Sequence, residues 1–129
     1  MKSELFDLWI KKLEDGSYTQ GNGALRRKED EGDLYCCLGV LCDISGFGEW
    51  GAVGAYGTHV EYIHGADSAV GILPWELAEN LGVYTDGSPR RGDGFANRYG
   101  TPMGMNDSGV TFSGIATALK EFRHEFVED

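Results

Sequence analysis

The stretch that decides the fold is YCCLGVLCD, residues 35–43, which is apolar on every side and holds all three cysteines of the chain. A helix that is apolar all round is buried on most of its faces. We therefore expect a central, buried helix over residues 34–44. Asp33 is its candidate N-cap, and Gly46 its end.

Three further helices are predicted around this segment. Residues 3–14 carry apolar side chains on one helical face, and residues 112–126 repeat them at alternating spacings of three and four. A shorter helix begins with Pro74 and ends before Gly82. Thr111 or Ser108 is expected to cap the last helix.

Between the helices lie long segments rich in glycine, of which the chain has 20. Residues 59–63 alternate weakly between apolar and polar and are predicted to pair with residues 70–72 across a turn at 65–68. Residues 83–105 are predicted to form a second long loop. The expected fold is a compact, helix-rich α+β single domain over residues 1–129. It would have about four helices, a small antiparallel β-hairpin and long Gly-rich loops.

Charge and composition limit the classes of partner. The net charge of −10 disfavours nucleic acid and anionic membranes, because backbone binding needs clustered Lys and Arg. No run approaches the roughly 18 apolar residues that span a membrane, and no signal-peptide pattern begins the chain. A soluble, cytoplasmic protein is expected, and a small phosphorylated ligand is still compatible with local arginines.

The three cysteines favour a buried helix over a site. Cys36, Cys37 and Cys42 lie at offsets of one and six, which match neither the CxxC pairs of zinc sites nor a disulfide framework. No metal and no cofactor is therefore expected. The alternative is a catalytic thiol, because Cys36 or Cys37 at a helix N-terminus would have its thiolate favoured.

The loop over residues 20–27 is a candidate anion site. Gly21 and Gly23 allow a ligand close to the backbone, and Arg26 can bind phosphate or carboxylate through its forked guanidinium. Gln20 begins this loop. The alternative is a solvated turn whose arginines pair with the acidic residues at 29–31.

Two further groups of residues complete the predicted site. Asn106 and Asp107 form either an Asx turn that caps the last helix or a pair that reads a ribose hydroxyl or a base edge. Aromatic and arginine side chains in the long loops suit a nucleotide, through stacking and charge. These are Tyr35, Trp50, Tyr56, Tyr62, Tyr84, Tyr99, Arg90, Arg91 and Arg98.

Several motifs, in order along nearly the whole chain, resemble a group of small tailed-phage proteins. They are YxQGxGxLR at 18–26, YCCLGVLCD at 35–43, LP at 73–74 and NDxGxxFxxIA at 106–116. The chain departs from the group at Met105, where a Leu is usual. In outline such proteins are similar to the Sequestin and Lockin anti-defence families. That resemblance implies binding of nucleotide immune signals of the cyclic ADP-ribose or ADP-ribose-conjugate type made by TIR enzymes.

Three functions are therefore weighed. The leading one is a non-enzymatic protein that sequesters such a signal in the infected bacterial cell, as a homo-oligomer. The second is a phosphodiesterase or hydrolase with Asp107 or a histidine as base, or Cys36 as nucleophile. The third is an acidic inhibitor that binds a basic host protein.

Overall fold

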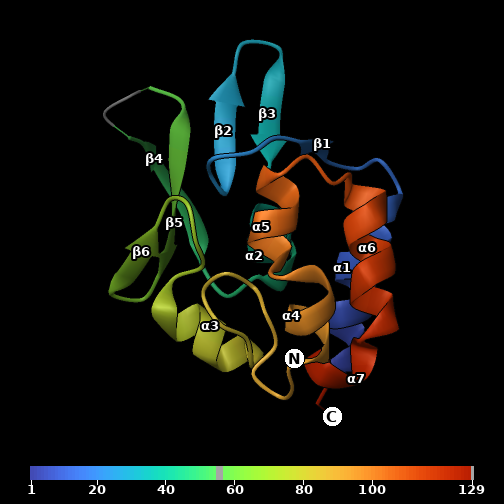
Figure 1. Ribbon diagram of the computed structural model, residues 1–129. Helices are drawn as coiled ribbons and strands as arrows, with labels where there is room; N and C mark the ends of the chain where they lie inside the picture. Colours follow the sequence, from blue (N-terminus) through green and yellow to red (C-terminus); the bar gives the residue numbers. More distant parts are fainter. Residues whose placement is uncertain (55–56, 129) are drawn as a thin grey trace.

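The computed structural model describes residues 1–54 and 57–128 (Figure 1). The strands are β1 Thr19–Gln20, β2 Arg26–Glu29, β3 Gly32–Tyr35, β4 Glu49–Val53, β5 His59–His64 and β6 Asp67–Ala69. The helices are α1 Ser3–Glu14, α2 Cys37–Ser45, α3 Trp75–Leu81, α4 Gly94–Tyr99, α5 Pro102–Asp107, α6 Phe112–Glu121 and α7 Arg123–Phe126. The α+β fold class is confirmed.

The strands form one mixed sheet in the order β1-β3-β2-β5-β4, with β6 also paired to β5. Only the β1–β3 pairing is parallel among the described strands; the others are antiparallel. Arg26 pairs with Tyr35 on one side and Val60 on the other, so β2 joins the N-terminal hairpin to the β4–β5–β6 part of the sheet.

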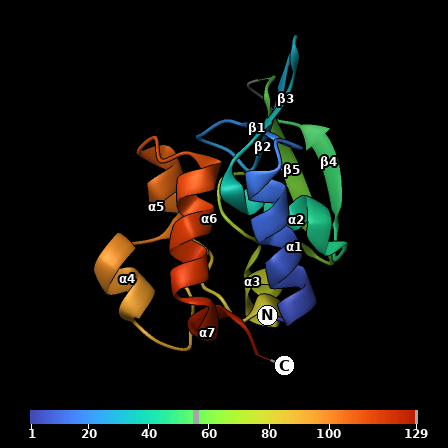
Figure 2. The same cartoon turned by 90° about the vertical axis from the view of Figure 1, so that its right-hand side faces the viewer.

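Helix α2 forms the centre of the hydrophobic core. Its residues from Cys37 to Cys42 are fully buried. Helix α1 packs against both α2 and α6, and the Trp9 indole N–H donates to the Cys37 carbonyl at 2.9 Å. Figure 2 shows α1 and α6 side by side, with the sheet beyond α2.

The helix predicted over residues 34–44 begins later than expected. Leu34 and Tyr35 belong to β3, and α2 starts at Cys37. Cys36 is the N-cap, its sulfur accepting from the Gly39 N–H at 3.4 Å. The proposed cap, Asp33, instead pairs with Arg26 across the hairpin. An ion pair between neighbouring strands therefore decided this boundary.

The other helices were predicted closely, with one exception. Helix α1 has the expected bounds, α3 ends at Gly82 in the left-handed conformation, and Thr111 caps α6. The last helix divides at Phe122 into α6 and α7. The prediction of one long loop over residues 83–105 was wrong, because α4 and most of α5 form there.

The β5–β6 hairpin is confirmed, but its turn is tighter than predicted. His64 pairs with Asp67, so β6 occupies residues 67–69 in place of 70–72. Among the described residues, no helix combines the length and apolarity needed to cross a membrane.

Gly39 gives a direct test of the packing of α2. A Cβ at this position would lie 1.7 Å from the Leu25 carbonyl oxygen, so we expect Gly39→Ala to lower the free energy of unfolding by about 3 kcal/mol. Gly71→Ala is the control, because a Cβ there meets nothing within 4 Å, and it should change stability by less than about 1 kcal/mol. Chemical denaturation measures both; equal stability of the two variants would contradict this packing.

Candidate functional site

Gln20 uses its side-chain amide to hold the start of α6. Its Nε2 donates to the Val110 carbonyl at 2.8 Å and to Asn106 Oδ1 at 3.1 Å, while Oε1 accepts from the Phe112 N–H at 2.9 Å. Both ends of the amide are therefore engaged within the fold. A ligand at Gln20 would have to compete with these bonds.

Asn106 is 2% exposed and is equally engaged. Its Oδ1 accepts from the Cys37 backbone N–H at 3.1 Å, and its Nδ2 donates to the Gly21 carbonyl at 2.8 Å. Asn106 and Asp107 are the last two residues of α5, so they do not cap α6 as one reading of the sequence expected. The structure thus brings Gln20, Gly21 and Asn106 together as a support for the fold.

The surroundings of the glycine loop are acidic. The Gly21 N–H donates to the Tyr35 carbonyl at 2.8 Å, and the Gly23 N–H faces Asp107 Oδ1 at 3.5 Å. Arg26 pairs with Asp33 through Nε at 2.8 Å and through its terminal nitrogen. A phosphate here would meet carboxylates and an arginine whose charge is already compensated.

Four predicted residues lie in one aromatic cluster beside this loop. The Arg26 guanidinium carbon is 5.5 Å from the Tyr35 ring centre and 5.3 Å from that of Trp50. Trp50 in turn packs edge-on against Tyr62 at 4.9 Å. Tyr62 is 1% exposed, so its ring has no free face for a base.

Tyr18 and Asp43 belong to this cluster, although the sequence did not single them out. Asp43 accepts from the Tyr18 hydroxyl at 2.5 Å and from the Trp50 indole N–H at 2.9 Å. Burial, followed by the hydrogen bond to Asp43, raises the pKa of Tyr18 well above its usual value. Their places in the YxQGxGxLR and YCCLGVLCD motifs were the available signal.

A second arginine–aromatic arrangement lies at the start of α3. The Arg90 guanidinium carbon is 4.7 Å from the Tyr84 ring centre and 5.9 Å from that of Trp75, and Nε donates to the Val83 carbonyl at 2.8 Å. Trp75 is 59% exposed and Tyr84 49%. We call Trp75, Tyr84 and Arg90 the α3 patch. Sequence reasoning missed Trp75, because it assigned this residue to the packed side of a helix.

The remaining predicted residues lie outside both arrangements. Arg91 donates to the Val127 carbonyl at 2.6 Å. Arg98 pairs with Glu121 at 3.0 Å and stacks on Tyr99, on α4 at the far end of the molecule from the β2–β3 hairpin (Figure 1). Tyr56 lies outside the described residues. The predicted arginines therefore do not converge on one phosphate site.

The three cysteines are buried in the core. Cys36 is 3% exposed, and Cys37 and Cys42 are fully buried. Burial raises the pKa of Cys36 to about 11 and raises those of the other two thiols further above their usual value. Within residues 1–54 and 57–128, no group of His, Cys, Asp or Glu has the arrangement of a metal site.

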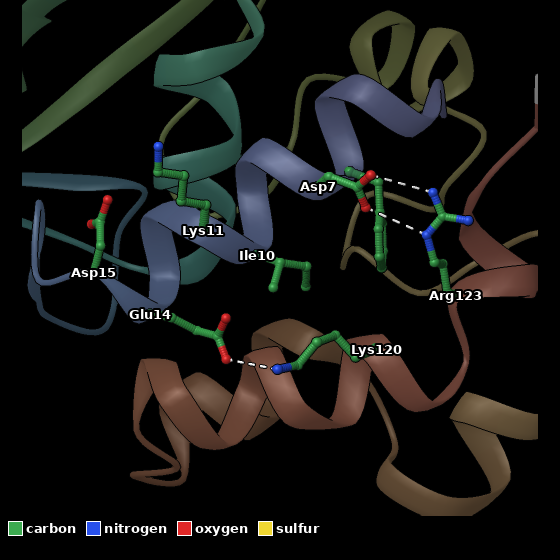
Figure 3. Close-up of a pocket in the computed structure, with 8 residues that line it drawn as sticks. Asp7, Ile10, Lys11, Glu14, Asp15, Lys120 and Arg123 are labelled. Atoms are coloured by element: carbon green, nitrogen blue, oxygen red, sulfur yellow. Dashed lines mark hydrogen bonds and ion pairs between the residues drawn. The ribbon is translucent and has the colours of Figure 1, made fainter.

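A groove of about 570 Å³ runs between α1 and α6. Ile10 lies at its middle, and the Asp7–Arg123 and Glu14–Lys120 ion pairs connect the two helices across it (Figure 3). Acidic and basic side chains are balanced along the groove, and the two bridging cations already have carboxylate partners. Its charge therefore gives no preference for a phosphorylated ligand.

The buried amide of Asn106 is expected to contribute to stability. Asn106→Ala should lower the free energy of unfolding by about 3 kcal/mol, because it leaves the Cys37 N–H and the Gly21 carbonyl without their partner. Asp107→Ala, at the exposed neighbour, should stay within about 0.5 kcal/mol of wild type. Urea denaturation measures the difference, and an unchanged midpoint for Asn106→Ala would refute this role.

The thiols are expected to be unreactive in the folded protein. At pH 8, iodoacetamide should modify no cysteine of the native chain and all three after unfolding, as read by intact mass. Above pH 9 the unfolded thiol ionises before the folded one, so the free energy of unfolding should fall as pH rises toward about 11. Rapid native labelling of Cys36 would contradict both statements.

Comparison with known proteins identifies a family. A family model described as "Domain of unknown function (DUF8296)" matches residues 1–123. No curated protein and no solved structure matches the chain significantly. The chain therefore belongs to the DUF8296 family.

Proposed function

We propose that this protein binds a small phosphorylated nucleotide at the α3 patch and releases it chemically unchanged. The observation that carries this proposal is the position of Arg90. Its guanidinium lies over Tyr84 and near Trp75, and no ion pair among the described residues involves it. A guanidinium without a carboxylate partner is available for a phosphate.

The chemistry of the α3 patch matches the two parts of a nucleotide. The exposed rings of Trp75 and Tyr84 offer stacking surfaces to a base, and Arg90 offers forked donors to a phosphate. Arg91 follows in sequence and adds a second positive charge. In a chain of net charge −10, this local pair of cations favours an anion here over the acidic surroundings of Arg26.

The biological part of the proposal rests on the resemblance to phage proteins. In an infected bacterial cell, the protein would sequester a cyclic ADP-ribose or ADP-ribose-conjugate signal as a homo-oligomer. The burial of all three thiols and their raised pKa values disfavour the alternative in which Cys36 is a nucleophile. A hydrolase with Asp107 or a histidine as base, and an acidic inhibitor of a host protein, are outcomes that the same experiment separates.

Nucleotide binding tests the site by substitution. With ADP-ribose as probe, we expect Trp75→Ala and Arg90→Ala each to weaken binding by about tenfold or more, because base stacking contributes ~1–3 kcal/mol. Phe47→Ala and Arg98→Ala are matched controls, an exposed aromatic and an exposed arginine elsewhere, and should bind as wild type. Isothermal titration calorimetry gives the affinities.

Two further results would change the assignment. If Arg26→Ala abolishes binding and Arg90→Ala does not, the ligand lies at the aromatic cluster and the α3 patch is the wrong site. Mass spectrometry of the ligand released by denaturation separates the functions. An intact nucleotide supports sequestration, a consumed one indicates an enzyme, and neither binding nor consumption would refute both.

A further inference from the structure

We propose that two copies of this chain associate face to face through the α3 patch and the charges that flank it, and that the pair encloses the ligand. The enclosure rests on the proposed function; the association does not. The surface consists of the α3 patch together with Ile72, Glu76, Glu79 and Arg91, and is called the α3 face below.

The centre of the α3 face is apolar and open. Trp75 and Tyr84 are the two most exposed aromatic side chains on it, and Ile72, three residues before Trp75, is 43% exposed. Large apolar side chains that gather on a surface mark interaction sites, and Trp, Tyr and Arg are the residues most enriched where binding energy concentrates. This composition suits contact with another protein surface.

The charges on the two sides of this centre are opposite. Glu79 is one helical turn after Trp75 and on the same face of α3, and Glu76 lies beside it. Arg90 and Arg91 lie on the segment that packs against the start of α3. None of the ion pairs between described residues involves these four side chains. The face therefore has an unpaired acidic side and an unpaired basic side.

A surface with this pattern is complementary to a second copy of itself. In a twofold contact each residue of one copy meets its counterpart's partner, so the acidic side of one copy lies against the basic side of the other. Two interactions of the same kind form at once, and the apolar centres meet between them. A chain of net charge −10 repels its copies elsewhere, so local complementarity decides where association occurs.

The same contact supplies what the nucleotide site lacks. Trp75 is 59% exposed, so one copy offers a ring and a cation on an open surface. Small-molecule sites commonly bury 70–90% of their ligand, as a general rule. A second α3 face provides the opposite wall, with another Trp75 and another Arg90, and converts the open surface into an enclosed site.

Charge reversal tests the association without any ligand. One variant carries Glu76→Arg and Glu79→Arg, and the other carries Arg90→Glu and Arg91→Glu. We expect wild type to be a dimer by sedimentation velocity and native mass spectrometry, and each variant alone to be a monomer. An equimolar mixture should restore a one-to-one heterodimer, because both contacts then join opposite charges.

Controls separate a broken contact from a broken fold. Lys28→Glu and Asp30→Arg reverse exposed charges on the β2–β3 hairpin and should leave the dimer unchanged. Circular dichroism and thermal melting verify that every variant is folded. A monomeric wild type, or a dimer that persists in both charge-reversed variants, overturns the inference.

The two proposals fail separately. A wild-type monomer that still binds ADP-ribose through Arg90 would preserve the proposed function and remove the shared site. A dimer that the charge-reversed mixture restores, but that binds no nucleotide, would preserve the association and remove the ligand. Trp75→Ala, compared with Phe47→Ala, should weaken the dimer in the absence of nucleotide.

Discussion

The arrangement of this domain depends on one pair of side-chain amides. Gln20 and Asn106 are 86 residues apart, yet they bond to each other and to backbone groups of Gly21, Cys37 and Phe112. They thereby connect β1, the start of α2, the end of α5 and the start of α6. Because a buried amide without partners is costly, these bonds favour one relative placement of the four segments.

Around that support, the chain carries two arginine–aromatic arrangements with different electrostatics. Arg26 lies over Tyr35 and Trp50, but Asp33 compensates its charge. Arg90 lies over Tyr84, and its Nε bonds only to a backbone carbonyl. Both look alike in sequence, as an arginine among aromatics. The availability of the guanidinium charge is what separates an arrangement that holds strands together from one that suits an anionic ligand.

The cysteine-rich helix illustrates how burial removes a tempting chemistry. Three thiols at a helix start resemble a reactive or metal-binding group, but the fold places all of them in the core. A thiolate there would lose its hydration, so the thiols stay protonated and act as small apolar side chains. The helix contributes packing, and the polar groups that matter lie in the segments around it.

The sequence by itself determined the elements that local pattern controls. The apolar face of residues 3–14, the glycine after α3 and the threonine before α6 all act within a few residues, so they were readable. Long-range pairing decided the rest: the Arg26–Asp33 pair extended β3 into the predicted helix, and Asn106 became a support for the fold. Trp75 became exposed for the same reason. Helical spacing defines a face, but only the packing of other elements determines whether that face is covered.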